Sequence, residues 1–170
     1  MISSKAKQLI ETGNVGAPDV RYGSILLAVD GSAPAIEATR HAVQLAKQMH
    51  AKLTAVFVDY DGEDEVIPEE HWPRYAEEEE QVLYGLAGIE VAKTMAEAEN
   101  VPFIGIFLLG STAQAIAALA SRQHVDLIVA GDTGLTGFKH FLLGSFAEAI
   151  VKEAHIPVLV IKNNREAETP

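Results

Sequence analysis

The chain has 170 residues, of which 48% are hydrophobic and 22% charged, a balance typical of one globular domain with one core. It contains no cysteine, which excludes disulfides, thiolate metal sites and thiol nucleophiles. The formal net charge of -11 argues against binding to nucleic acids or anionic membranes, because phosphate-binding surfaces need excess lysine and arginine. No apolar run approaches the roughly 18 residues that span a bilayer, so we expect no membrane insertion and a cytoplasmic location.

The first 21 residues are polar and contain Gly13, Gly16 and Pro18. They predict a flexible N-terminal extension outside the core, with a short helix over Ser4–Glu11. The core domain is expected to begin at Tyr22.

A continuous apolar run, Ser24–Val29, predicts a strand that is buried on both faces. Asp30 and Gly31 end this run. Alanines then recur at steps of three and four residues, which predicts an amphipathic helix that begins near Ser32.

A second buried strand is predicted at Leu53–Val58, followed by an acidic insertion at about 59–80. The segment 61–99 holds 13 acidic and two basic residues, so it carries the whole net charge. Glu77–Glu80 is expected in the first turn of the next helix, facing the positive end of its dipole. With Trp72 and Tyr75 exposed among the charges, the insertion is either a solubilising segment or a loop that docks a partner.

The rest of the chain continues the alternation of strands and helices and ends in a polar tail, 163–170. The predicted elements are a strand at Val101–Leu109, a helix at Thr112–Gln123, a strand at Asp126–Ala130, a helix at Ser145–Ala154 and a strand at Pro157–Ile161.

This alternation predicts an α/β fold, a single doubly wound, open, five-stranded parallel sheet with helices on both faces. In a Rossmann-like arrangement of strand order 3-2-1-4-5, the first and fourth strands are neighbours. Their carboxyl ends then flank the crevice where such sheets bind ligands.

A glycine-rich stretch, "AGDTGLTGFKHFLLGS", follows the fourth strand at this position. Glycines without a Cβ let a ligand approach the backbone amides, and a helix that opens at Gly144 and Ser145 favours an anion. The alternative is plain turn chemistry, because Ser145 with Glu148 has the spacing of a capping box. Asp30 has the same ambiguity, since an aspartate after a strand commonly caps the next helix.

The spacing Gly131-x2-Gly134-x9-Gly144-Ser145 resembles the G-x2-G-x9-G-[S/T] nucleotide loop of the universal stress protein family. The resemblance covers residues 22–162 and includes "DLIVAG" before the loop, "LLGS" at its end and "HIPVLVIK" near the C-terminus.

The resemblance implies a site for ATP or a related adenine nucleotide, AMP or ADP, in a stress-response or regulatory protein that acts through an unidentified protein partner. It also implies a homodimer formed through the last strand, Val158–Ile161. Asp132 departs from the family pattern and would either repel a triphosphate or help to hold Mg2+. The implied nucleotide-binding residues are Ala28, Asp30, Val58, Ala130, Gly131, Gly134, Gly144, Ser145 and Phe146.

Two other functions stay open from the sequence. One is a slow Mg-dependent ATPase or adenylyl-handling enzyme that would use Lys139, His140 and a metal at Asp132. The other is a nucleotide-independent interaction module that uses the acidic insertion. The sequence favours binding over turnover, because it has no G-x4-G-K-[ST] loop and its histidines are scattered singly. We therefore assign no catalytic and no metal-binding residue.

The glycines themselves generate an expectation. If they make room for a nucleotide, Gly131→Ala or Gly144→Val abolishes binding with the fold retained, whereas Gly137→Ala has little effect.

Overall fold

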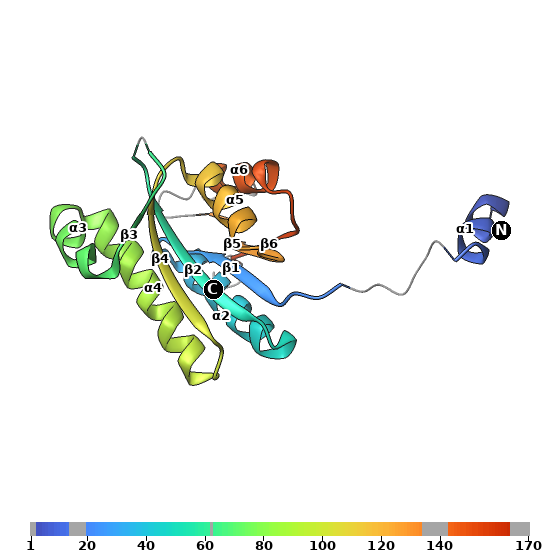
Figure 1. The fold of residues 1–170 in the computed structure, drawn as a ribbon, viewed down its shortest axis with the longest axis horizontal. Coiled ribbons are helices and arrows are strands. Elements are labelled where there is room, and N and C mark those ends of the chain that lie inside the picture. Colours follow the sequence, from blue (N-terminus) through green and yellow to red (C-terminus); the bar gives the residue numbers. More distant parts are fainter. Residues whose placement is uncertain (1–2, 14–19, 62, 134–142, 164–170) are drawn as a thin grey trace, which may run out of the picture.

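The computed structural model describes residues 3–13, 20–61, 63–133 and 143–163. Its elements alternate as the sequence predicts, with three additional short elements between the second and third predicted strands (Figure 1). In chain order they are α1 (Ser4–Glu11), β1 (Ser24–Ala28), α2 (Ala33–Met49), β2 (Lys52–Asp59), β3 (Glu65–Ile67), the 3-10 helix η1 (Glu69–His71), α3 (Trp72–Glu78), α4 (Glu80–Ala98), β4 (Phe103–Leu109), α5 (Thr112–Arg122), β5 (Leu127–Gly131), α6 (Ser145–Glu153) and β6 (Val158–Ile161).

The strands form one sheet in the order β3-β4-β2-β1-β5-β6. The five predicted strands take the predicted order and are parallel. The predicted count of five is wrong by one strand, because β3 adds an antiparallel edge beside β4. Its three residues, of which only Ile67 is buried, are too few to show the alternation that marks a strand in a sequence.

Helices cover both faces of the sheet, as predicted. On one face α2 and α4 pack against Ile25, Leu27, Leu53 and Phe107. On the other face α5 and α6 pack against a second cluster that includes Leu26 and Ile128 (Figure 1). Successive residues of β1 point to opposite faces of the sheet. Because helices cover both faces, all five residues of β1 are buried, which explains the continuous apolar run.

The acidic insertion is folded and contributes to the core. Trp72 and Tyr75, expected in solvent, are half-buried and pack against the cluster under α2 and α4. The Trp72 indole Nε1 donates a hydrogen bond to the Ile67 carbonyl at 2.9 Å. The Tyr75 ring meets Phe107 edge-on with centroids 5.4 Å apart. The expectation of exposed aromatic residues is therefore wrong.

The run of glutamates is also divided differently from the prediction. Helix α3 ends at Glu78, and Glu79 is the N-cap of α4, with an extended backbone. Only Glu80 lies in the first turn of α4. The break between α3 and α4 thus falls inside a run of four glutamates, whose composition gives no sign of it.

The helix expected at Ser4–Glu11 is present as α1. None of its residues is buried. Within the described parts of the chain, no helix combines the length and apolar character needed to cross a bilayer.

We expect Trp72→Phe to lower the free energy of unfolding by about 1 kcal/mol, because the Ile67 carbonyl loses its indole donor. Urea unfolding followed by far-UV circular dichroism measures this. Tyr60, which is 78% exposed, is the control, and Tyr60→Phe should change stability by less than about 0.5 kcal/mol. An unchanged stability in Trp72→Phe would show that the insertion does not support the core.

Candidate functional site

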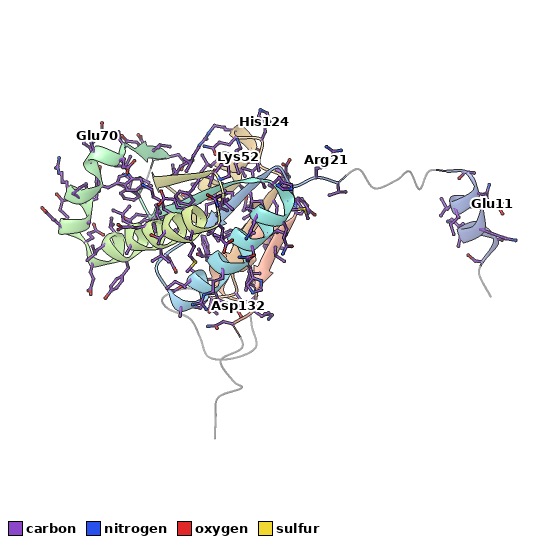
Figure 2. The ribbon with its side chains drawn as sticks, turned by 90° about the horizontal axis from the view of Figure 1, so that it is seen from below. Glu11, Arg21, Lys52, Glu70, His124 and Asp132 are labelled. Carbon is purple, nitrogen blue, oxygen red and sulfur yellow. The ribbon has the colours of Figure 1, made fainter. Side chains whose placement is uncertain are left out.

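The parallel pairing of β1 with β5 sets the position of the site. Leu26 lies opposite Ile128, and Leu27 opposite Val129. The chain leaves the two strands at Asp30 and Gly131, at the same edge of the sheet. Figure 2 shows Asp132 at this edge, away from Lys52 and His124 at the other end. The structure therefore brings these predicted residues together at the switch point of the sheet.

Asp30 shapes the turn that follows β1. Its Oδ1 accepts a hydrogen bond from the Ser32 backbone N–H at 2.9 Å. Ser32 in turn caps α2, with Oγ accepting from the Ala35 N–H at 3.3 Å. Gly31 has φ +80°, and a Cβ there would lie 2.3 Å from the Tyr84 carbonyl oxygen. This turn is thus fixed by the fold itself, and it holds the half-buried Asp30 at the edge of the site.

The glycines at the ends of the loop also meet the protein's own backbone. A Cβ on Gly131 would lie 2.9 Å from the Pro34 carbonyl oxygen, in the first turn of α2. A Cβ on Gly144 would lie 2.8 Å from the Asp132 carbonyl oxygen, which accepts a hydrogen bond from the Gly144 N–H at 2.7 Å. These contacts do not support the expectation that either glycine can be replaced with the fold unchanged. Gly134 and Gly137 lie outside the described residues.

The capping box that the spacing of Ser145 and Glu148 offered as the alternative to a ligand site is absent. Gly144 is the N-cap of α6, and its carbonyl accepts the Glu148 N–H at 2.9 Å. Ser145 is the first helical residue, and no side chain among the described residues caps this end. Glu148 is paired with Lys152 at 2.8 Å. The exposed Ser145 hydroxyl and the first backbone amides of α6 can therefore serve a ligand.

Asp132 has a structural role within the chain. Its Oδ2 accepts a hydrogen bond from the Asn163 N–H at 3.2 Å, and Thr133 Oγ1 donates to Oδ1 at 3.3 Å. This carboxylate thereby joins the end of β5 to the residues after β6. In the described ranges, no three histidine, aspartate or glutamate side chains are grouped closely enough to hold a metal ion. Lys139 and His140 lie outside the described residues.

Four further predicted residues belong to one cluster on the face covered by α5 and α6. Ala28 and Ala130 are 5% and 1% exposed, so only their backbone can face a ligand. Val58 and Phe146 are half-buried and pack against the same cluster. The cluster gives the floor of the site an apolar character.

Asp59, at the carboxyl end of β2, is a further polar residue at this edge that was not among those predicted from the sequence. Gln81 Nε2 donates to its Oδ1 at 2.9 Å. Partial burial, and then the negative charge of Glu79, raise the pKa of the Asp59 carboxyl above its ordinary value. Asp59 follows a predicted strand directly, as Asp30 does, and this position could have marked it as a candidate site residue. Asp59 adds negative charge to the β2 side of the edge.

Known proteins share the sequence pattern and the fold of this chain. The family model described as the universal stress protein family matches residues 21–162. The chain belongs to the universal stress protein family. One relative is universal stress protein MJ0531 of Methanocaldococcus jannaschii, with 36% identity over 148 residues that cover 85% of each chain.

Two solved structures share the fold of this universal stress protein domain. One is a universal stress protein in complex with cAMP, with a TM-score of 0.66 and 22% identity, covering 82% of this chain and 97% of that one. The other is a universal stress protein from Archaeoglobus fulgidus in complex with dAMP, with a TM-score of 0.61 and 20% identity, covering 83% and 98%.

We expect Gly131→Ala and Gly144→Ala each to lower the free energy of unfolding by about 1 to 3 kcal/mol, because the added methyl group meets rigid backbone. Gly23→Ala is the control. Its Cβ would lie 3.6 Å from the Asp126 carboxylate, an ordinary contact, and should cost much less. Chemical denaturation measures all three. Full stability in both loop variants, with only ligand binding lost, would show that these glycines serve a ligand alone.

Proposed function

We propose that this universal stress protein domain binds an adenine nucleotide, ATP or its products ADP and AMP, at the carboxyl edge of β1 and β5. In this role it acts as a cytoplasmic stress-response regulator through a protein partner. The observation that carries the proposal is the start of α6, where Gly144 is the N-cap, no described side chain occupies the helix end and Ser145 is exposed.

The chemistry of this end suits the phosphates of a nucleotide. The first amides of a helix lack intrahelical partners and carry the positive end of the dipole, so they stabilise an anion. The Ser145 hydroxyl adds one donor. The Asp132 carboxylate, which carries the wrong charge, already accepts hydrogen bonds from Asn163 and Thr133.

The other side of the edge suits the base and the ribose. Val58 is half-buried and contributes apolar surface, while Asp30 contributes a carboxylate that can accept hydrogen bonds from ribose hydroxyls or the adenine amino group. The complexes of the two solved relatives with cAMP and dAMP support an adenine ligand. The proposal is one of binding, with no catalytic residue assigned.

Isothermal titration of ligand-stripped protein with ATP, AMP and adenosine tests the site. We expect Ser145→Ala to bind ATP and AMP about tenfold more weakly, since one hydrogen bond to a charged group contributes about 1.5 kcal/mol or more. The affinity for adenosine should not change. Ser121, exposed near the end of α5, provides the matched control Ser121→Ala, which should bind like the wild type.

Two results would contradict the proposal. The absence of binding to any adenine nucleotide would remove the site, and it would favour an interaction module independent of nucleotides. Equal affinities in Ser145→Ala and the wild type would place the phosphates elsewhere than at α6.

We also propose that the domain forms a homodimer through β6. Among the described residues, strand β6 pairs with β5 on one side only. The carbonyls of Pro157 and Ile161 accept hydrogen bonds from Ile128 in β5 and from Asp132 directly after it. The alternate residues, Val158 and Val160, therefore direct their backbone groups outward. Pairing with the same strand of a second copy satisfies these groups and closes an edge that would otherwise promote aggregation.

We expect Leu159→Lys, at an apolar side chain that is 38% exposed on β6, to shift the protein from dimer to monomer. A lysine there adds like charges across the two-fold axis. The control is Val66→Lys, because Val66 is 51% exposed on β3, at the opposite edge of the sheet. Sedimentation velocity at micromolar concentration measures the effect. A wild-type species of only 18.3 kDa would contradict the dimer.

A further inference from the structure

Helix α1 has the character of a helix that lacks its packing partner. It has eight residues, and its N-cap Ser3 accepts the Ala6 N–H through Oγ at 3.2 Å. Leu9 and Ile10 are 51% and 66% exposed, and no residue of the helix is buried. Because so short a helix is not stable in water on its own, a surface that covers its apolar side chains is needed to maintain it.

The apolar residues of α1 lie on one face. Ala6, Leu9 and Ile10 are three and four residues apart, and so they are neighbours on the helix surface. Lys5 and Lys7 lie on either side of this face. The helix therefore presents an apolar stripe between two positive charges.

Helix α4 presents a matching surface. Leu83, Ala87 and Val91 follow one another at steps of four residues, with Tyr84 beside them. Leu83 and Tyr84 are 51% and 48% exposed, Ala87 is exposed and Val91 is partly so. We call these four residues the α4 stripe.

The charges around the α4 stripe are complementary to those of α1. Glu80 lies at the beginning of the stripe and Glu90 along its edge, and both are exposed. Lys93, the only basic residue of α4, lies toward the other side of the helix. The stripe is thus apolar with an acidic border, whereas the α1 face is apolar with a basic border.

The connection between the two is long enough for an intramolecular contact. Twelve residues, Thr12–Gly23, separate α1 from β1, and an extended chain of that length spans about 40 Å. The turn at Gly31 touches Tyr84. Gly31 lies seven residues beyond Ser24, the start of β1. At the rise of a strand, the distance from Ser24 to Gly31 is about 25 Å. The stripe is therefore within reach of α1.

We propose that α1 docks on the α4 stripe of its own chain, with Leu9 and Ile10 against Leu83, Tyr84 and Ala87. Lys5 and Lys7 then face the acidic border of the stripe. The short tether gives α1 a high effective concentration at this surface, so the apolar contact and the charge pairs need only be modest in strength. The proposal does not rest on the proposed nucleotide site.

Disulfide trapping in the full-length chain tests the contact, because the chain has no cysteine of its own. The variant Ile10→Cys/Ala87→Cys places two thiols at exposed positions that the proposal brings together. The matched control, Gln8→Cys/Ala87→Cys, moves the first thiol by two residues to the polar face of α1. Ile10→Cys/Leu83→Cys provides a second, independent pair.

Under mild oxidation, we expect both Ile10 pairs to form an intramolecular disulfide about ten times faster than the Gln8 pair. Adding Lys5→Glu and Lys7→Glu should slow the Ile10 pairs, since like charges then face each other. Equal rates for the Ile10 and Gln8 pairs would show a tethered helix without a docked face and would overturn the proposal. Disulfides between two chains would assign the surface to a second copy and would overturn it equally.

Discussion

The parallel pairing of β1 with β5 is the contact on which the rest of the site depends. The chain first builds the sheet outward from β1 through β2 to β4 and then returns to the other side of β1. The reversal brings Asp30 and Gly131 to one edge, although about a hundred residues separate them in the sequence. Packing on both faces fixes the register of β1, because a slip by one residue would exchange the side chains that serve the two cores.

A series of close backbone contacts extends this order beyond the sheet. Gly131 packs on the first turn of α2, and Gly144 packs on Asp132 while donating a hydrogen bond to its carbonyl. The Asp132 carboxylate in turn holds Asn163 after β6. The start of α6 is consequently fixed by the sheet through the main chain, and its first amides do not have to be ordered when an anion arrives. Such preorganisation reduces the cost of binding.

The order of the main strands could be predicted because buried parallel strands are continuous apolar runs, and Ser24–Val29 shows this clearly. The short β3 could not, because three residues with two exposed members carry no periodic signal. Trp72 and Tyr75 were misplaced because acidic neighbours dominate the local composition, while the contact that buries them comes from Phe107 and the rest of a distant core. At α6, the sequence S-x-x-E is compatible with Ser145 as either the cap or the first helical residue. Only the hydrogen bond from the Glu148 N–H to the Gly144 carbonyl decides between them.

The distribution of charge along the carboxyl edge gives the proposed nucleotide a direction. The acidic segment forms β3, α3 and α4, at the β4 side of the sheet, and its influence reaches Asp59, whose pKa is raised by burial and by Glu79. Phosphates bound there would meet like charges at short range, where screening by salt is weak. At the other side of β1 is the N-terminus of α6. The Asp132 carboxylate beside it is held by Asn163 and Thr133, and the first-turn carboxylate of Glu148 is paired with Lys152. The same asymmetry would attract a basic helix such as α1 to the β4 side. It would direct the anionic end of the proposed nucleotide toward β5 and α6 and leave the base to Val58 and Asp30.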